Sequence, residues 1–162
     1  MKSVWWVIAL AAFAGACAGD RPTPTGIAAN LLKQNGLLEC SPLPASAVKQ
    51  TIGPAGGTMK IGPHVFVVPA GALASWVTIQ AKTAGGMGNA VAFKPAGLIF
   101  LKPAYLTLSY ANCNASGSTA SKQVAYTTDS LTIVSYVTSW DDASTQQVTG
   151  QVAHFSNYAV AW

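Results

Sequence analysis

Short apolar runs that alternate with turn residues fill the chain from Ala45 to its end. Each run is rich in β-branched, aromatic or aliphatic residues and is too short for the three turns of a stable helix. Pairs such as Gly53-Pro54 and Gly62-Pro63 stand between the runs, and their backbone preferences suit tight turns. The runs are AVKQTI, HVFVV, VTIQA, AVAF, LIF, YLTLSY, VAYT, LTIVSYV, QQVTGQVA and YAVAW. This pattern predicts an all-β fold, a single antiparallel β-sandwich of about eight to ten strands.

The run at 105–110 (YLTLSY) alternates strictly, which is typical of a strand with one buried face. Leu106 and Leu108 share one face, and Tyr105 and Thr107 share the other. With 162 residues, of which 51% are hydrophobic, the chain has enough apolar material for one well-buried domain. We therefore expect one sandwich domain over residues 45–162.

The N-terminus has the three parts of an export signal. Lys2 supplies the positive charge, residues 4–16 (VWWVIALAAFAGA) are uncharged and mainly apolar, and small residues precede Cys17. This stretch is shorter than the roughly 20 apolar residues that a membrane span requires. We therefore expect a signal peptide at 1–16 that is removed.

Ala14-Gly15-Ala16 followed by Cys17 resembles the lipobox of bacterial lipoproteins, although Ala14 stands where that motif usually has Leu. The resemblance implies a lipid anchor on Cys17. Because Ala18, and not Asp, follows the cysteine, it also implies the outer membrane of the bacterial cell envelope. The alternative is simple cleavage before Cys17 or after Ala18, which would give a soluble secreted or periplasmic protein.

Residues 17–44 are rich in Pro, Gly, Ala and Asn, and we expect them to form a tether, partly flexible, between the membrane and the domain. Only the segment LLKQNGLLEC could order, as one helical turn or as a strand pinned by Cys40. The chain has three cysteines, an odd number for an exported protein. If Cys17 carries lipid, Cys40 and Cys113 remain to form a disulfide, and the alternative is two small buried thiols.

Charged residues are few, and this excludes several classes of function. The chain has nine Lys and Arg residues and five Asp and Glu residues, which gives a net charge of +4. Because the basic residues do not cluster in the sequence, we expect no nucleic-acid partner. The only histidines, His64 and His154, have no Cys, Asp or Glu at ligand spacing, so we expect no metal and no cofactor. Asp141-Asp142 is expected to form a solvated turn. The composition argues against an enzyme.

Blocks containing Gly and Pro follow one another in a defined order over residues 51–110. They are G-P-A-G-G-T at 53–58 (with Gly56 and Gly57), V-P-A-G-A-L at 68–73 (with Pro69, Gly71, Ala72 and Leu73), V-T-I at 77–79, Pro95-Ala96-Gly97, Phe100 and Pro103. In this order they resemble the ZU-five domain, the β-sandwich module of ankyrins, netrin receptors and tight-junction scaffolds. The resemblance implies a non-catalytic structural or protein-binding module. It identifies no partner in the cell envelope.

The triplet His154-Phe155-Ser156 resembles the segment before the closing strand of this family, and in some members the Phe–Ser bond cleaves itself. That chemistry would have the Ser156 hydroxyl attack the Phe155 carbonyl, with His154 moving the proton, before water opens the ester. The competing interpretation is structural: His154 is half-buried in a strand, Phe155 fills the core and Ser156 starts a turn. A further alternative is carbohydrate binding by exposed aromatic residues, with Trp76, Trp140 and Trp162 as candidates, against ordinary packing.

Overall fold

The computed structural model describes residues 36–84, 86, 89–116 and 119–162. The predicted signal peptide at 1–16, the predicted lipidation site Cys17 and the tether as far as residue 35 lie outside the described residues. In the part that is described, no helix is long and apolar enough to cross a membrane.

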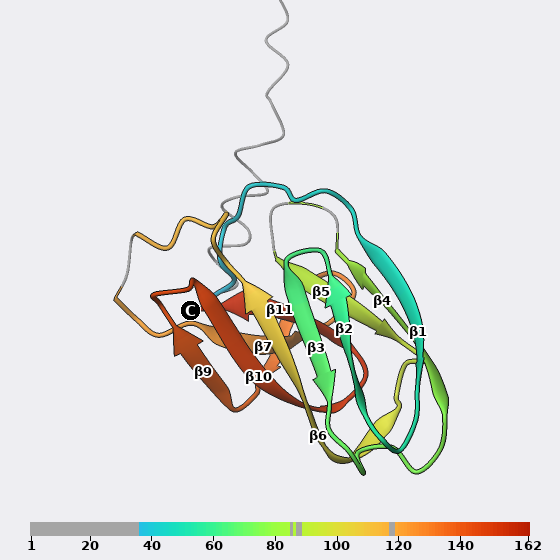
Figure 1. Cartoon of the computed structure of the whole chain (residues 1–162). Coiled ribbons are helices and arrows are strands. Elements are labelled where there is room, and N and C mark those ends of the chain that lie inside the picture. Colours follow the sequence, from blue (N-terminus) through green and yellow to red (C-terminus); the bar gives the residue numbers. More distant parts are fainter. Residues whose placement is uncertain (1–35, 85, 87–88, 117–118) are drawn as a thin grey trace, which may run out of the picture.

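In the described residues, eleven strands form two antiparallel sheets that pack face to face (Figure 1), which confirms the predicted all-β sandwich. The six-stranded sheet has the order β1 (Ala47–Ile52), β4 (Val77–Thr83), β5 (Ala90–Lys94), β11 (Asn157–Ala161), β7 (Gln123–Thr127) and β8 (Ile133–Tyr136). The five-stranded sheet has the order β2 (Gly57–Ile61), β3 (His64–Val68), β6 (Ile99–Ser109), β10 (Gln147–His154) and β9 (Ser139–Asp142).

Strand β9 corrects the expectation of a solvated turn at Asp141-Asp142. The Asp141 carboxylate accepts a 2.6 Å hydrogen bond from the Tyr110 hydroxyl and a 2.7 Å bond from the backbone N–H of Lys122. Burial and this carboxylate together raise the pKa of Tyr110. Asp142 does cap a turn, because its carboxylate accepts hydrogen bonds from Ser144. Asp141 thus ties three separate segments together.

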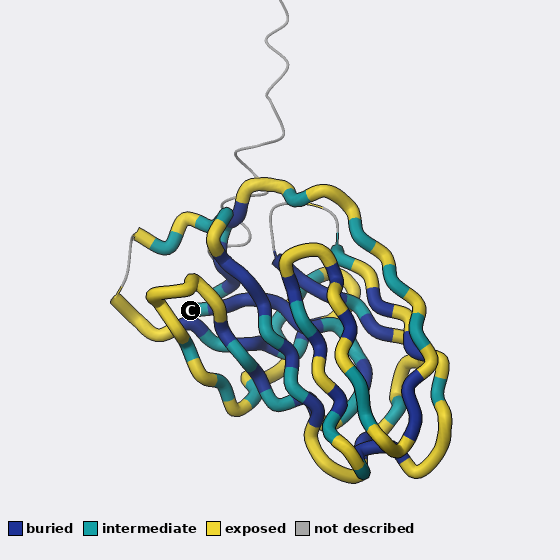
Figure 2. The backbone as a smooth tube through the Cα atoms, viewed as in Figure 1, coloured by how far each residue is buried: buried dark blue, intermediate teal, exposed yellow. Residues whose placement is uncertain are grey.

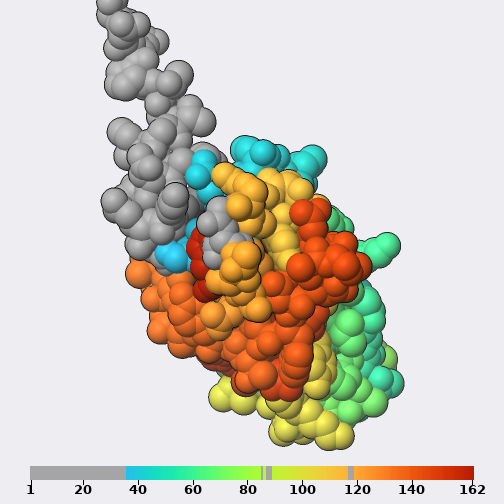
Figure 3. All heavy atoms as spheres, turned by 90° about the vertical axis from the view of Figure 1, so that its left-hand side faces the viewer, coloured from blue at the N-terminus to red at the C-terminus, as the bar shows by residue number. Residues whose placement is uncertain are grey.

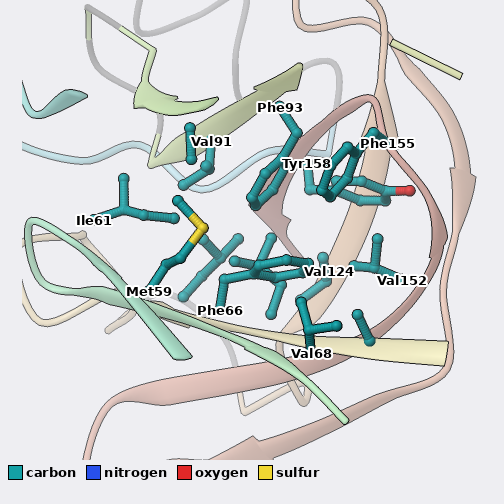
Figure 4. Packing of buried hydrophobic residues seen from close by; sticks show 14 of the residues in the cluster. Met59, Ile61, Phe66, Val68, Val91, Phe93, Val124, Val152, Phe155 and Tyr158 are labelled. Carbon is teal, nitrogen blue, oxygen red and sulfur yellow. The ribbon is translucent and has the colours of Figure 1, made fainter. Parts of the chain in front are cut away.

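The core lies between the two sheets, where inward-facing apolar side chains meet. Figure 2 marks the buried residues along the strands in dark blue. Its centre is aromatic: the Phe66 ring of the five-stranded sheet lies 4.6 Å from that of Phe93 in the six-stranded sheet, measured between centroids. Phe155 stacks on Phe93 at 5.0 Å and meets Phe100 edge-on at 5.0 Å. Figure 4 shows Phe155 and Tyr158 beside Phe93 at one end of this cluster. Such close aromatic packing fixes how the two sheets face each other.

The end of the predicted tether packs into the fold. Leu37 and Leu38 are buried, and the backbone N–H of Leu38 donates a 3.1 Å hydrogen bond to the Val160 carbonyl. Figure 3 shows this first described segment, in cyan, next to the red C-terminal residues. Cys40 and Cys113 form the predicted disulfide, which joins the segment to the chain beyond β6. The packed region therefore includes residues 37–40, N-terminal to the predicted start at Ala45.

Candidate functional site

The triplet 154–156 forms the connection between β10 and β11. His154 ends β10, and Phe155 and Ser156 lead into β11. Only 2% of Phe155 is exposed, and its backbone is held on both sides: its N–H donates to the Leu98 carbonyl at 2.8 Å, and its carbonyl accepts from the Gly97 N–H at 3.1 Å. The turn is therefore fastened to the loop between β5 and β6.

His154 is bound to Tyr158, four residues along the chain. The Tyr158 hydroxyl donates a 2.7 Å hydrogen bond to the His154 carbonyl and lies 3.0 Å from Nδ1 of the same residue. A phenol has one proton, so we assign Nδ1 as the donor to the hydroxyl oxygen. The Tyr126 ring meets the imidazole edge-on at 5.0 Å. Burial raises the pKa of Tyr158, so this hydroxyl keeps its proton and its role as a donor.

Ser156 is half-buried, and its backbone carbonyl accepts a 3.0 Å hydrogen bond from the Phe93 N–H. Among the described residues, its hydroxyl has no hydrogen-bond partner, and no bond joins it to His154. The three residues thus occupy the positions that the structural interpretation gives them: a half-buried strand residue, a core aromatic and a turn. The fold adds one feature that bears on self-cleavage: the Phe155 carbonyl oxygen already accepts a hydrogen bond from a backbone N–H.

Two glycines of the blocks that resemble the ZU-five domain, Gly56 and Gly71, are required by the backbone at one end of the sandwich. Gly56 has a φ of +78°, and a Cβ there would collide with the carbonyl oxygen of Val68. Gly71 has a φ of +75°, and its N–H donates a 2.8 Å bond to the Pro54 carbonyl. These contacts fasten the end of β3 to the turn between β1 and β2.

The other residues of these blocks complete the same end of the fold. Gly57 is the first residue of β2. Pro69 comes directly after the last residue of β3, a position that suits proline because it has no backbone N–H to donate to the sheet. Ala72 and Leu73 are buried, and the Ala72 carbonyl accepts a 2.9 Å hydrogen bond from the Leu101 N–H. The predicted motif is therefore a structural unit that links the two sheets.

A shallow groove of about 750 Å³ crosses the outer face of the six-stranded sheet. Residues of β1, β4 and β5 line most of it, and Asp129, Leu131, Ser156 and Asn157 belong to the same lining. Three exposed lysines, Lys49, Lys82 and Lys94, are part of this lining, and we call the site the lysine groove.

Sequence reasoning missed the lysine groove because its lysines lie far apart along the chain. A usable signal was present: each lysine stands at a polar position of an alternating run, AVKQTI, VTIQAKT or AVAFK. Alternation places such residues on the solvent face, but only the strand order brings the three runs together.

The three candidate tryptophans lie on separate elements. Trp140 of β9 is 52% exposed, and its ring centroid lies 6.4 Å from that of Tyr105 in β6. Trp76, in the loop before β4, is 72% exposed and lies over Gly53. Trp162 is half-buried, and the Lys122 ammonium lies 4.3 Å from its ring centroid. Of these three tryptophans, Trp140 pairs with another aromatic ring among the described residues, that of Tyr105, and the three do not form a strip.

The described part of the chain holds no group of three or more His, Cys, Asp or Glu side chains placed to bind a metal ion. The fold and the groove together define an antiparallel β-sandwich with a basic outer face. No protein-family model matches the chain, and no curated protein matches it.

Proposed function

We propose that this protein is a non-catalytic binding module of the bacterial cell envelope, similar to the ZU-five domain, and that a protein partner binds in the lysine groove. The observation that carries the proposal is the groove itself, which combines small apolar residues with three exposed ammonium groups on one face. Its lining includes Ala47 and Ala92, whose side chains are small and apolar. Rigid strands position these side chains, which favours recognition of one defined surface.

Export and anchoring are part of the proposal. The signal-like residues 1–16 and the lipobox-like cysteine Cys17 support a lipid anchor in the outer membrane. The disulfide between Cys40 and Cys113 is consistent with an oxidising compartment. Intact mass of the protein from the membrane fraction tests this part, since acylation of Cys17 adds a defined mass to the mature chain. A mature chain without lipid would place the protein among soluble secreted or periplasmic proteins.

Photo-crosslinking in a bacterial host tests the binding role. A photoreactive amino acid replaces Gln80, which lines the lysine groove, and in a matched variant it replaces Gln147, an exposed glutamine of β10. We expect a crosslinked product of defined mass from position 80 and none of that mass from position 147. Absence of a product at position 80, or the same product at both positions, would contradict the proposal.

Self-cleavage of the Phe155–Ser156 bond is the second candidate function, and one contact favours it. The Gly97 N–H that bonds the Phe155 carbonyl would stabilise negative charge on that oxygen if the Ser156 hydroxyl attacked. The C–N bond would break as the C–O bond forms, the hydroxyl proton would pass to the Ser156 nitrogen, and water would then hydrolyse the ester. The hydrogen bonds between His154 and Tyr158 favour the binding role, because they use the imidazole in holding the turn.

Carbohydrate binding is a further alternative, and the pair of Tyr105 and Trp140 supports it. Two aromatic rings on one sheet face could stack on a sugar. Titration of peptidoglycan fragments, followed by tryptophan fluorescence, tests this alternative. Trp140→Ala should abolish any change, and Trp76→Ala should leave it intact, because Trp76 lies on a different element.

A further inference from the structure

The lysines of the groove form a compact triangle that the strand register defines. Gln80 pairs with Lys49 on one side and with Lys94 on the other, so these two lysines flank it in one row across three strands. Strands lie about 4.8 Å apart, which separates the Cα atoms of Lys49 and Lys94 by about 10 Å. Lys82 lies two residues from Gln80 along β4, a further step of about 7 Å on the same face.

Positive charge exceeds negative charge in the groove lining, by three lysines to one carboxylate. None of the three lysines forms an ion pair with a described residue. Asp129 is the carboxylate in the lining, and it accepts a 2.6 Å hydrogen bond from the Asn157 amide. Asp141 and Asp142 lie on β9 of the other sheet, where their carboxylates accept hydrogen bonds from Tyr110 and Ser144. An unbalanced set of ammonium groups on one concave face attracts anionic ligands.

We infer that the lysine groove accepts an extended acidic segment of a protein partner. This inference rests on the proposed function and names the chemistry of the partner. In an extended segment, carboxylates at alternate positions lie about 7 Å apart on one side. Lys82 is the diagonal neighbour of Lys49 on one side and of Lys94 on the other, and such diagonal neighbours lie about 7–8 Å apart. Flexible lysine side chains cover the remaining difference in distance. The side chains between the carboxylates point away from the groove, and the small side chain of Ala92 lets the segment lie close to the sheet. A flat membrane surface would not enter a concave groove.

Fluorescence anisotropy of the full-length chain with two labelled peptides tests the inference. One peptide alternates Glu and Thr, and its control has Gln in place of each Glu. We expect binding of the Glu peptide alone, and weaker binding when NaCl rises from about 50 to about 200 mM. Lys49→Gln with Lys94→Gln should weaken binding about five- to tenfold, as expected for exposed ion pairs.

The matched control replaces two lysines of the five-stranded sheet, Lys60→Gln with Lys102→Gln, and changes the net charge equally. It should leave the affinity within about twofold, because Lys60 and Lys102 lie on the other sheet and do not line the groove. General charge attraction would instead weaken binding equally in both double variants. Equal loss in both variants, or equal binding of the Glu and Gln peptides, would overturn the inference.

Two further outcomes separate this inference from the proposed function. A crosslinked partner at position 80 without preference for the Glu peptide would overturn the acidic segment and leave the binding module in place. Co-sedimentation with phosphatidylglycerol vesicles that depends on Lys49 and Lys94 would overturn the inference in favour of an anionic lipid surface. Loss of both the crosslink and the peptide binding would reject both proposals.

Discussion

Nδ1 of His64 accepts a 3.2 Å hydrogen bond from the backbone N–H of Ser109, a residue 45 positions further along the chain. His64 opens β3 and Ser109 ends β6, so the bond closes the end of two strands in the five-stranded sheet. Only 1% of His64 is exposed. Because Nδ1 accepts, the ring proton is on Nε2, and within the described residues Nε2 has no hydrogen-bond partner. The imidazole is thus buried in its neutral form.

We expect this histidine to make the fold sensitive to acid. Burial lowers the pKa of His64 from 6.5 to about 4, so between these values the unfolded chain binds a proton that the folded chain does not. Stability therefore rises with pH across this window, and acidification from pH 7 to about 4 should cost about 3 kcal/mol. His64→Asn retains an acceptor and removes the titration. Urea unfolding at both pH values should show a smaller acid loss in this variant, and equal losses would contradict the prediction.

The disulfide should contribute strongly to stability because it closes a long loop. Cys40 and Cys113 are 73 positions apart, and the chain-entropy model gives about 4 kcal/mol for a loop of this length. We expect a reducing agent to lower the free energy of unfolding of the wild type by this amount. The double variant Cys40→Ala with Cys113→Ala should already show the loss and should not respond to the agent. An unchanged wild-type midpoint under reducing conditions would count against the prediction.

Gly150 of β10 should tolerate no side chain, because the two sheets approach each other there. A Cβ at this position would lie 2.6 Å from the Cβ of Val124 in the opposite sheet and 2.9 Å from a methyl group of Val137. Gly150→Ala should therefore destabilise the fold by about 1–3 kcal/mol in a denaturation experiment. Gly57→Ala is the matched control, since the atoms nearest its Cβ would be those of Ile52, at ordinary contact distance. Equal effects of the two substitutions would show that close packing is not the cause.

Strands with apolar alternation and clear turn residues at both ends could be predicted from the sequence. AVKQTI and HVFVV match β1 and β3 residue for residue. GTMKI (β2) was missed because it overlaps the glycine block, and SWDD (β9) because two acidic residues suggest a turn. The bond from Tyr110 to Asp141, which helps hold β9, joins residues 31 positions apart and leaves no local pattern. Most of LIF and YLTLSY lies in the single strand β6 (Ile99–Ser109), which continues through Pro103.

The candidate sites also differ in how far they could be predicted from the sequence. The turn at 154–156 is local, so its half-buried histidine, core phenylalanine and turn serine could be foreseen. The lysine groove depends on the sheet order β1-β4-β5, which pairs a strand from the start of the domain with two later strands. Strand order is a property of the whole fold, so the positions of charged residues along the sequence do not reveal it.

The Phe155–Ser156 bond should stay intact, and this separates the binding role from self-cleavage. The Phe155 ring is buried against Phe93 and its backbone is fixed by Leu98 and Gly97, so the peptide is held in a packed turn. After long incubation at neutral pH, denaturing mass spectrometry should find one chain that ends at Trp162. Ser156→Ala should have the same C-terminus and the same rate of loss of intact chain. A fragment of residues 156–162 that appears in the wild type and is absent from Ser156→Ala would establish self-cleavage. In that case Tyr158→Phe would show whether release of His154 from its hydroxyl partner speeds the reaction.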